Sequence, residues 1–97
     1  MILRGRDLPE ENRRKPYPLP KECGVLQHFV QRVTLPDNPF EPHRHEGAEL
    51  WYIQDGEAIL TLDGDEHRVE SGDLIVLLPN VEHGLRTDSR VTWICMA

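Results

Sequence analysis

Three histidines and one glutamate have the residue types and the spacing of a metal site. His43 and His45 are two positions apart, and side chains two apart in a β-strand point to the same face. Glu49 has the same parity, so its carboxylate can reach that face too. A neighbouring strand carrying His83 would complete a set of three nitrogens and one oxygen. This donor set suits one divalent transition metal, with Mn, Fe, Co, Ni, Cu and Zn as the candidates. The lack of thiolate ligands argues against a structural zinc knuckle.

Strands are needed to hold these side chains, and the sequence predicts them along most of its length. The segment 25–35 is rich in β-branched and aromatic residues, and Val25, Phe29, Val33 and Leu35 share one face of it. Short β-compatible segments follow at near-regular spacing: 48–54, 57–62, 66–69, 73–78, 83–87 and 90–96. No ten-residue helical pattern separates them. The predicted fold class is therefore all-β, a sandwich or a barrel.

Two Asp-Gly pairs predict tight turns between consecutive strands. Asp55-Gly56 and Asp63-Gly64 are hairpin signals, because the turns of two-residue hairpins need positive φ. The apolar run 74–78 lacks alternation, which predicts a strand covered on both faces, with a second subunit as one possible cover.

Alternation also predicts which neighbours of the candidate ligands point inward. If Glu49 faces the interior, Trp51 and Ile53 do so too, while intervening residues face outward: Leu50, Tyr52 and Gln54. Leu85, two after His83, is expected inside. We expect Trp51 and Trp93 to be core residues rather than ligand-stacking ones. The side chains expected to face away from the site are Arg44, Glu46, His67 and His28.

Residues 1–22 differ from the rest of the chain. Their four prolines each fix φ and donate no hydrogen bond, so an extended N-terminal arm is expected ahead of a barrel domain over 23–97. Such an arm can lie on the barrel or on a second subunit. Its basic cluster, Arg13-Arg14-Lys15, is interpreted as solvated rather than as a phosphate site.

Length and charge exclude several classes of protein. A chain of 97 residues has room for one core, and its net charge of −6 with no basic stripe argues against nucleic-acid binding. No apolar run is long enough to span a membrane, and the N-terminus lacks a signal core, so a cytoplasmic location is expected. Cys23 and Cys95 are too few for a disulfide framework. They could form a bridge if the first and last strands are neighbours, but we expect buried free thiols.

Two spaced motifs give the chain a resemblance to the cupin superfamily, over about 25–96. The first family motif runs Gly, five residues, His-x-His, three or four residues, Glu, six residues, Gly. Here it has Asp37 for the leading glycine, followed by the matching residues His43, His45, Glu49 and Gly56. The second runs Gly, five residues, Pro-x-Gly, two residues, His, three residues, Asn. It is matched at Gly72 and His83, with departures at Leu78, Asn80 and Thr87.

The resemblance is to small single-domain conserved-barrel (cupin 2) proteins, and it implies a double-stranded β-helix, or jelly-roll, barrel. It also implies that His43, His45, Glu49 and His83 bind a divalent metal inside that barrel. Cupins include dioxygenases, sugar-phosphate isomerases, decarboxylases and lyases, so a metal-dependent enzyme acting on a small molecule is one hypothesis. The alternative is a non-catalytic small-ligand-binding or sensor protein, whose metal is structural or holds the ligand. A homodimer formed through sheet faces or the arm is expected.

Overall fold

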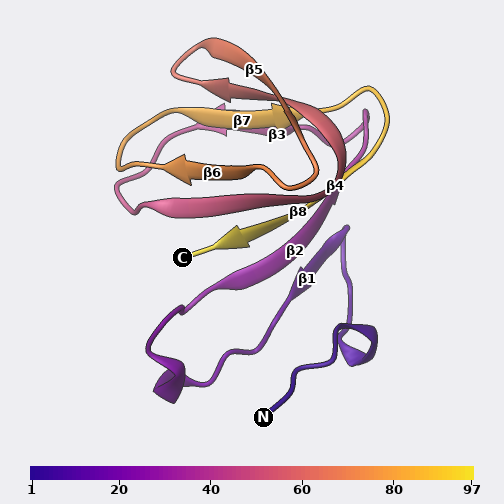
Figure 1. Cartoon of the computed structure of the whole chain (residues 1–97), viewed down its shortest axis with the longest axis vertical. Coiled ribbons are helices and arrows are strands. Elements are labelled where there is room, and N and C mark those ends of the chain that lie inside the picture. The colour runs from indigo at the N-terminus through magenta and orange to yellow at the C-terminus, as the bar shows by residue number, and fades with distance from the viewer.

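The computed structural model describes residues 1–97 and consists of strands in one strongly curled antiparallel sheet (Figure 1). The strands are β1 (Arg14–Pro16), β2 (Phe29–Thr34), β3 (Phe40–His43), β4 (Glu49–Leu62), β5 (Asp65–Glu70), β6 (Leu74–Leu77), β7 (His83–Arg86) and β8 (Val91–Met96). Their order is β1-β2-β8-β4-β7-β3, and β5 and β6 each pair with β4. The helical turns are two short 3-10 segments, η1 (Gly5–Asp7) and η2 (Lys21–Cys23). The all-β jelly-roll prediction is confirmed.

Strand β4 joins the two halves of the barrel. Its first half pairs with β6 and β8, and its second half pairs with β5 and β7. Between the halves, the register with β8 shifts between Ile53 and Asp55, and Gly56 has φ of +89°. A Cβ at Gly56 would lie 2.2 Å from the backbone oxygen of Arg90, so only glycine fits.

The hairpin predicted at Asp55-Gly56 is therefore wrong. The positive φ there serves a bulge that bends one continuous strand instead of reversing the chain. The hairpin at Asp63-Gly64 is confirmed, with φ of 46° and 88° at its two residues and Leu62 paired to Asp65.

The core lies on the inner face of the curled sheet. Trp51 and Ile53 are fully buried and Leu85 is 2% exposed, as alternation predicted, and Trp93 is a fully buried core residue as well. Strand β2 follows the opposite parity from the one its apolar residues suggested: Val30 and Thr34 are buried there. The reason is its register with β8, which places Val30 opposite Cys95 on the core face. On the outer face, Phe29 packs edge-on against Tyr17, with ring centroids 5.0 Å apart.

Strand β6 is covered on one face in this chain. Ile75 and Leu77 are buried, whereas Leu74, Val76 and Leu78 are 55%, 56% and 62% exposed. Nothing in the single chain packs on the outer face, so the expected cover by a second subunit stays a prediction.

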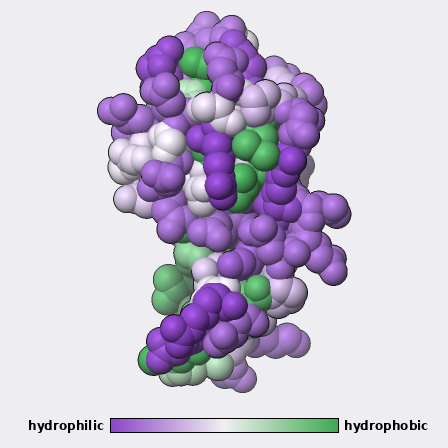
Figure 2. All heavy atoms as spheres, turned by 90° about the vertical axis from the view of Figure 1, so that its right-hand side faces the viewer, coloured by the Kyte–Doolittle hydropathy of each residue, from purple (hydrophilic) through white to green (hydrophobic).

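The N-terminal arm is extended but not free. It contributes β1 to the edge of the sheet, in register with β2, and it contains η1, while η2 lies at its junction with the barrel domain (Figure 1). Figure 2 shows the narrower lower part of the molecule below the barrel, with hydrophilic residues over most of this face. No helix in the structure is both long enough and apolar enough to cross a membrane.

The two cysteines are free and differ in environment. Cys95 is buried in β8, as expected, but Cys23 is exposed at the end of η2. The expectation of a buried thiol is wrong for Cys23, because it precedes β2 in a surface turn that has no core residue.

Candidate metal centre

His83 is the most deeply buried of the candidate ligands. It begins β7, is 1% exposed, and its Nδ1 lies 2.8 Å from the backbone oxygen of Val81. A carbonyl oxygen can only accept, so Nδ1 carries the proton and Nε2 keeps its lone pair. That Nε2 is buried and has no hydrogen-bond partner. Burial chiefly lowers the pKa of His83, with further lowering by His43 and His45, which favours the neutral ligand form.

His43 and His45 approach His83 from the β3–β4 segment. His43 ends β3 in register with His83, and its Nδ1 lies 3.1 Å from the backbone oxygen of Glu41, which again leaves Nε2 for a ligand. His45 lies beyond the end of β3, so the two do not share a strand as the spacing suggested. The loop after β6 secures His45 instead, because the backbone N–H of Asn80 donates to its carbonyl at 2.8 Å. Asn80 stands at a family glycine position and adopts the left-handed conformation, with φ of 66°.

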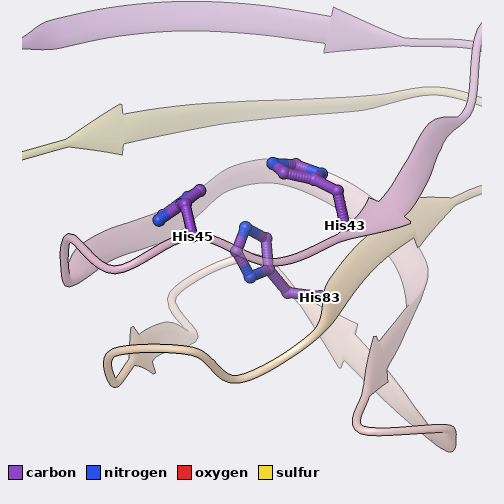
Figure 3. A group of neighbouring side chains, drawn as sticks. All are labelled: His43, His45 and His83. Atoms are coloured by element: carbon purple, nitrogen blue, oxygen red, sulfur yellow. The ribbon is translucent and has the colours of Figure 1, made fainter.

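The three imidazoles turn toward one another (Figure 3). Ring centroids lie 4.5 Å apart for His43 and His83, and 4.8 Å apart for His45 and His83. One potential ligand atom from each ring lies within 4.8 Å of the other two. Three of the four predicted ligands, from β3, the following loop and β7, are therefore neighbours in the structure.

Glu49 stands beside this triad at the start of β4. Its Oε1 lies 3.4 Å from Nε2 of His45 and 3.9 Å from Nε2 of His83. The same oxygen accepts a hydrogen bond from the indole Nε1 of Trp51 at 3.2 Å. Trp51 therefore orients the carboxylate as well as filling the core. The sequence analysis missed this role, although the shared parity of positions 49 and 51 was the signal for it.

Cys95 is a second neighbour that the sequence analysis missed. It lies opposite Trp51 in the β4–β8 pair. Burial, followed by the charge of Glu49, raises the pKa of this thiol to about 12. Cys95 is therefore a neutral side chain at the floor of the site, and the thiolate needed for metal ligation is disfavoured.

The residues present fit a first-row divalent ion. Neutral imidazole nitrogens with one carboxylate are typical ligands, and such an ion would satisfy the orphaned Nε2 of His83.

Side chains predicted to face away do so: Arg44 is 60% exposed and lies 3.5 Å from Glu82, and Glu46 is exposed. His67 is exposed, and the half-buried His28 lies outside the histidine cluster.

Solved structures similar to this chain share its barrel. A predicted oxalate decarboxylase from Thermotoga maritima superimposes with a TM-score of 0.82 at 20% identity, covering 99% of this chain and 96% of that one. The polyketide cyclase RemF from Streptomyces resistomycificus gives 0.80 at 18% identity, covering 100% and 78%. A cupin 2 conserved barrel domain protein from Salinispora arenicola gives 0.73 at 24% identity, covering 99% and 87%. At these identities the likeness shows the fold alone.

Curated relatives are similar over part of their length. The uncharacterized protein MJ1618 of Methanocaldococcus jannaschii is 28% identical over 69 residues, which are 70% of this chain and 55% of that protein. The dimethylsulfoniopropionate lyase DddW of Ruegeria pomeroyi is 33% identical over 49 residues, which are 50% of this chain and 32% of that enzyme.

The family model for the AraC-like ligand binding domain matches residues 25–96, which span β2 to β8 and include all four candidate ligands. Three of the four lie close together as an imidazole triad. The chain accordingly belongs to the AraC-like ligand binding domain family, as a small protein of the cupin 2 type.

Proposed function

We propose that this chain is a metal-dependent enzyme acting on a small molecule, with His43, His45, Glu49 and His83 holding one divalent transition ion. The observation that carries the proposal is the buried Nε2 of His83, which has no partner and belongs to the imidazole triad. An unpaired polar atom in a core costs free energy unless a ligand satisfies it.

The chain's own residues would prepare and orient the site. The carbonyls of Val81 and Glu41 hold the Nδ1 protons of His83 and His43, which fixes both tautomers for ligation through Nε2. Trp51 holds the Glu49 carboxylate beside the triad. A divalent ion bound there would supply Lewis-acid chemistry, polarising a carbonyl or enediolate or lowering the pKa of water.

The reaction class proposed is that of a dioxygenase, an isomerase or a lyase. Support comes from the enzymatic names of matched proteins, which are a decarboxylase, a cyclase and a lyase. The chain places no uncommitted general base beside the triad: Cys95 is held neutral, and Glu49 faces the imidazoles. Chemistry in which the ion activates dioxygen or an enolisable substrate needs the fewest additional groups.

A ligand-binding or sensor protein is the second candidate, favoured by the description of the family as a ligand binding domain. It would use the same site to capture a small acid or sugar. Binding without consumption of the ligand would identify a sensor, whereas turnover would identify an enzyme.

The test begins with elemental analysis of untagged protein, followed by titration with divalent ions. Metal-loaded protein is then assayed against diketones, keto acids and phenols. We expect Glu49→Gln to abolish turnover and Glu46→Gln, a matched change of an exposed carboxylate, to preserve it. If no transition metal is found and none binds on titration, the proposal fails.

We also propose that the protein is a homodimer in the cytoplasm. The exposed outer face of β6 supports the dimer, since Leu74, Val76 and Leu78 form an apolar surface that a second copy would cover. Two free thiols are consistent with a reducing compartment. Light scattering should report a dimer that Val76→Glu dissociates, while Val25→Glu, at an exposed site outside β6, leaves it intact.

A further inference from the structure

Arg32 is a half-buried charge that the metal centre does not explain. It lies on the inner face of β2 between the buried residues Val30 and Thr34. Its guanidinium carbon is 5.0 Å from the ring centroid of Phe40 and 5.5 Å from that of Trp93. These rings stabilise the cation, but the guanidinium has no hydrogen bond or ion pair in the structure. A partly desolvated cation without an acceptor is unfavourable.

A second arginine faces it. Arg14 of β1 is directly opposite Arg32 in the β1–β2 register, and directly opposed residues point to the same face. Arg14 likewise has no ion pair. Burial, and then the charge of Arg14, lower the pKa of Arg32. Like charges in opposed positions destabilise a strand pair, so this edge of the barrel carries an unbalanced positive charge.

Arg4, Arg6 and Arg90 have no ion pair either, but they are exposed, whereas Arg14 and Arg32 are half-buried. Several other arginines are neutralised. Arg13 pairs with Asp37, Arg68 with Glu57, and Arg86 with Glu66. The chain has a net charge of −6, so acidic partners are abundant. Two facing arginines without one indicate a place for an anion from outside the chain.

The position of Arg32 relates it to the histidines, whereas Arg14 lies outside the cavity that Arg32 lines. Arg32 lines a cavity of about 210 Å³ whose walls include Thr34, Asn38 and Phe40. The Phe40 centroid is 4.7 Å from that of His43, so the ring that packs on the guanidinium also neighbours the triad. The charge of Glu49 also reaches Arg32, since it raises the pKa of the guanidinium. The ring of Phe40 is therefore a common neighbour of the Arg32 guanidinium and of His43.

We propose that Arg32 and Arg14 bind the carboxylate of a small acid whose other end faces His43, His45 and His83. The planar guanidinium matches a carboxylate with two parallel hydrogen bonds, and the anion would relieve the repulsion between the two arginines. Only the part of this inference that places the second end of the acid at the histidines rests on the proposed metal function. It narrows the substrate class to small organic acids with a second oxygen donor suited to the ion.

Dicarboxylates from oxalate to glutarate are titrated into the protein, and the affinity of each is compared with that of its monoamide. Each titration is carried out once with saturating Mn²⁺ and once after metal removal. We expect Arg32→Met to weaken the best dicarboxylate about tenfold or more, with little effect on its monoamide. Arg14→Met should weaken it less, because Arg14 lies on the edge strand. Arg68→Met, a matched change at an exposed arginine on the β4–β5 hairpin, should have no effect.

Separate outcomes test the two proposals. Failure to bind Mn²⁺ or any other transition ion overturns the metal function, while a loss of dicarboxylate affinity in Arg32→Met without metal still supports the arginine site. Unchanged dicarboxylate affinity in both Arg32→Met and Arg14→Met overturns the arginine site, whatever the metal does. Tighter binding of inorganic phosphate than of every dicarboxylate overturns the carboxylate assignment. Thermal unfolding of each variant, with Arg32→Lys retaining the charge, separates lost packing from lost recognition.

Discussion

The two sides of the candidate metal centre are built differently. On the β7 side, His83 is 1% exposed, and both the core and the carbonyl of Val81 hold its ring. On the β3–β4 side, His43 is exposed and the side chain of His45 is 34% exposed, in a loop. The buried side is rigid because packing determines the ring position, whereas the exposed side has fewer contacts that restrict it.

This difference suggests a division of roles. His83 provides a preorganised ligand and the base of the site, and the β3–β4 segment provides the ligands next to solvent, where a substrate would enter. The variants below test this division, and they are arranged from the largest expected effect to the smallest.

His83→Ala should lower metal affinity more than any other single ligand change, by about a hundredfold or more. Even changing a residue that only hydrogen-bonds to a metal ligand lowers metal affinity by about 10–100-fold. His45→Ala should lower it less, since a solvent-exposed ligand is more readily replaced by water. Calorimetric titration of both variants gives the comparison. Far-UV circular dichroism should remain β-rich in His83→Ala, and loss of that signal would mean that the metal is chiefly structural. Equal losses of affinity in the two variants would contradict the division.

Trp51→Phe should lower metal affinity about tenfold, because it removes the indole N–H that orients Glu49 while keeping most of the ring. The measurement is the same titration. Trp93→Phe is the matched control, since the indole of Trp93 donates instead to the hydroxyl of Thr34, outside the ligand set. A similar effect in both variants would indicate a packing effect and remove the orienting role of Trp51.

Acid should destabilise the metal-free protein through His83. Because the folded state lowers the His83 pKa below its ordinary value of 6.5, the unfolded chain binds more protons in the interval between the two pKa values. The free energy of unfolding is therefore unaffected by the protonation of His83 above about pH 6.5. It decreases as pH falls from there toward the pKa of His83 in the folded state. Urea unfolding at several pH values measures this slope, which His83→Gln should reduce. An unchanged slope in that variant would assign the effect to other groups.

Arg44→Ala should have the smallest effect, although Arg44 lies between two candidate ligands. Its side chain points away from the triad, is 60% exposed and forms a surface ion pair with Glu82. Such pairs contribute about 0–1 kcal/mol to the free energy of unfolding. Metal affinity should remain within about twofold, as judged by titration, because the change removes no ligand. A larger loss would show that the β3–β4 segment is more rigid than its exposure suggests.

Local patterns in the sequence determined the composition of the site. The parity of positions 49, 51 and 53 predicted that Trp51 and Ile53 point inward, and both are buried. The motif spacing predicted that His43 and His83 lie together, and they are neighbours in the structure. These features depend on alternation along one strand, which is a property of the backbone and needs no knowledge of distant segments.

Only the tertiary structure decided the relations between strands. It reversed the expected parity of β2, turned the Asp55-Gly56 signal into a bulge, and placed Arg14 opposite Arg32. Each outcome depends on register, which long-range pairing and burial determine and which a shift by one residue would reverse. The sequence by itself therefore determined which residues could form a metal site, and the packing of distant strands decided what surrounds it.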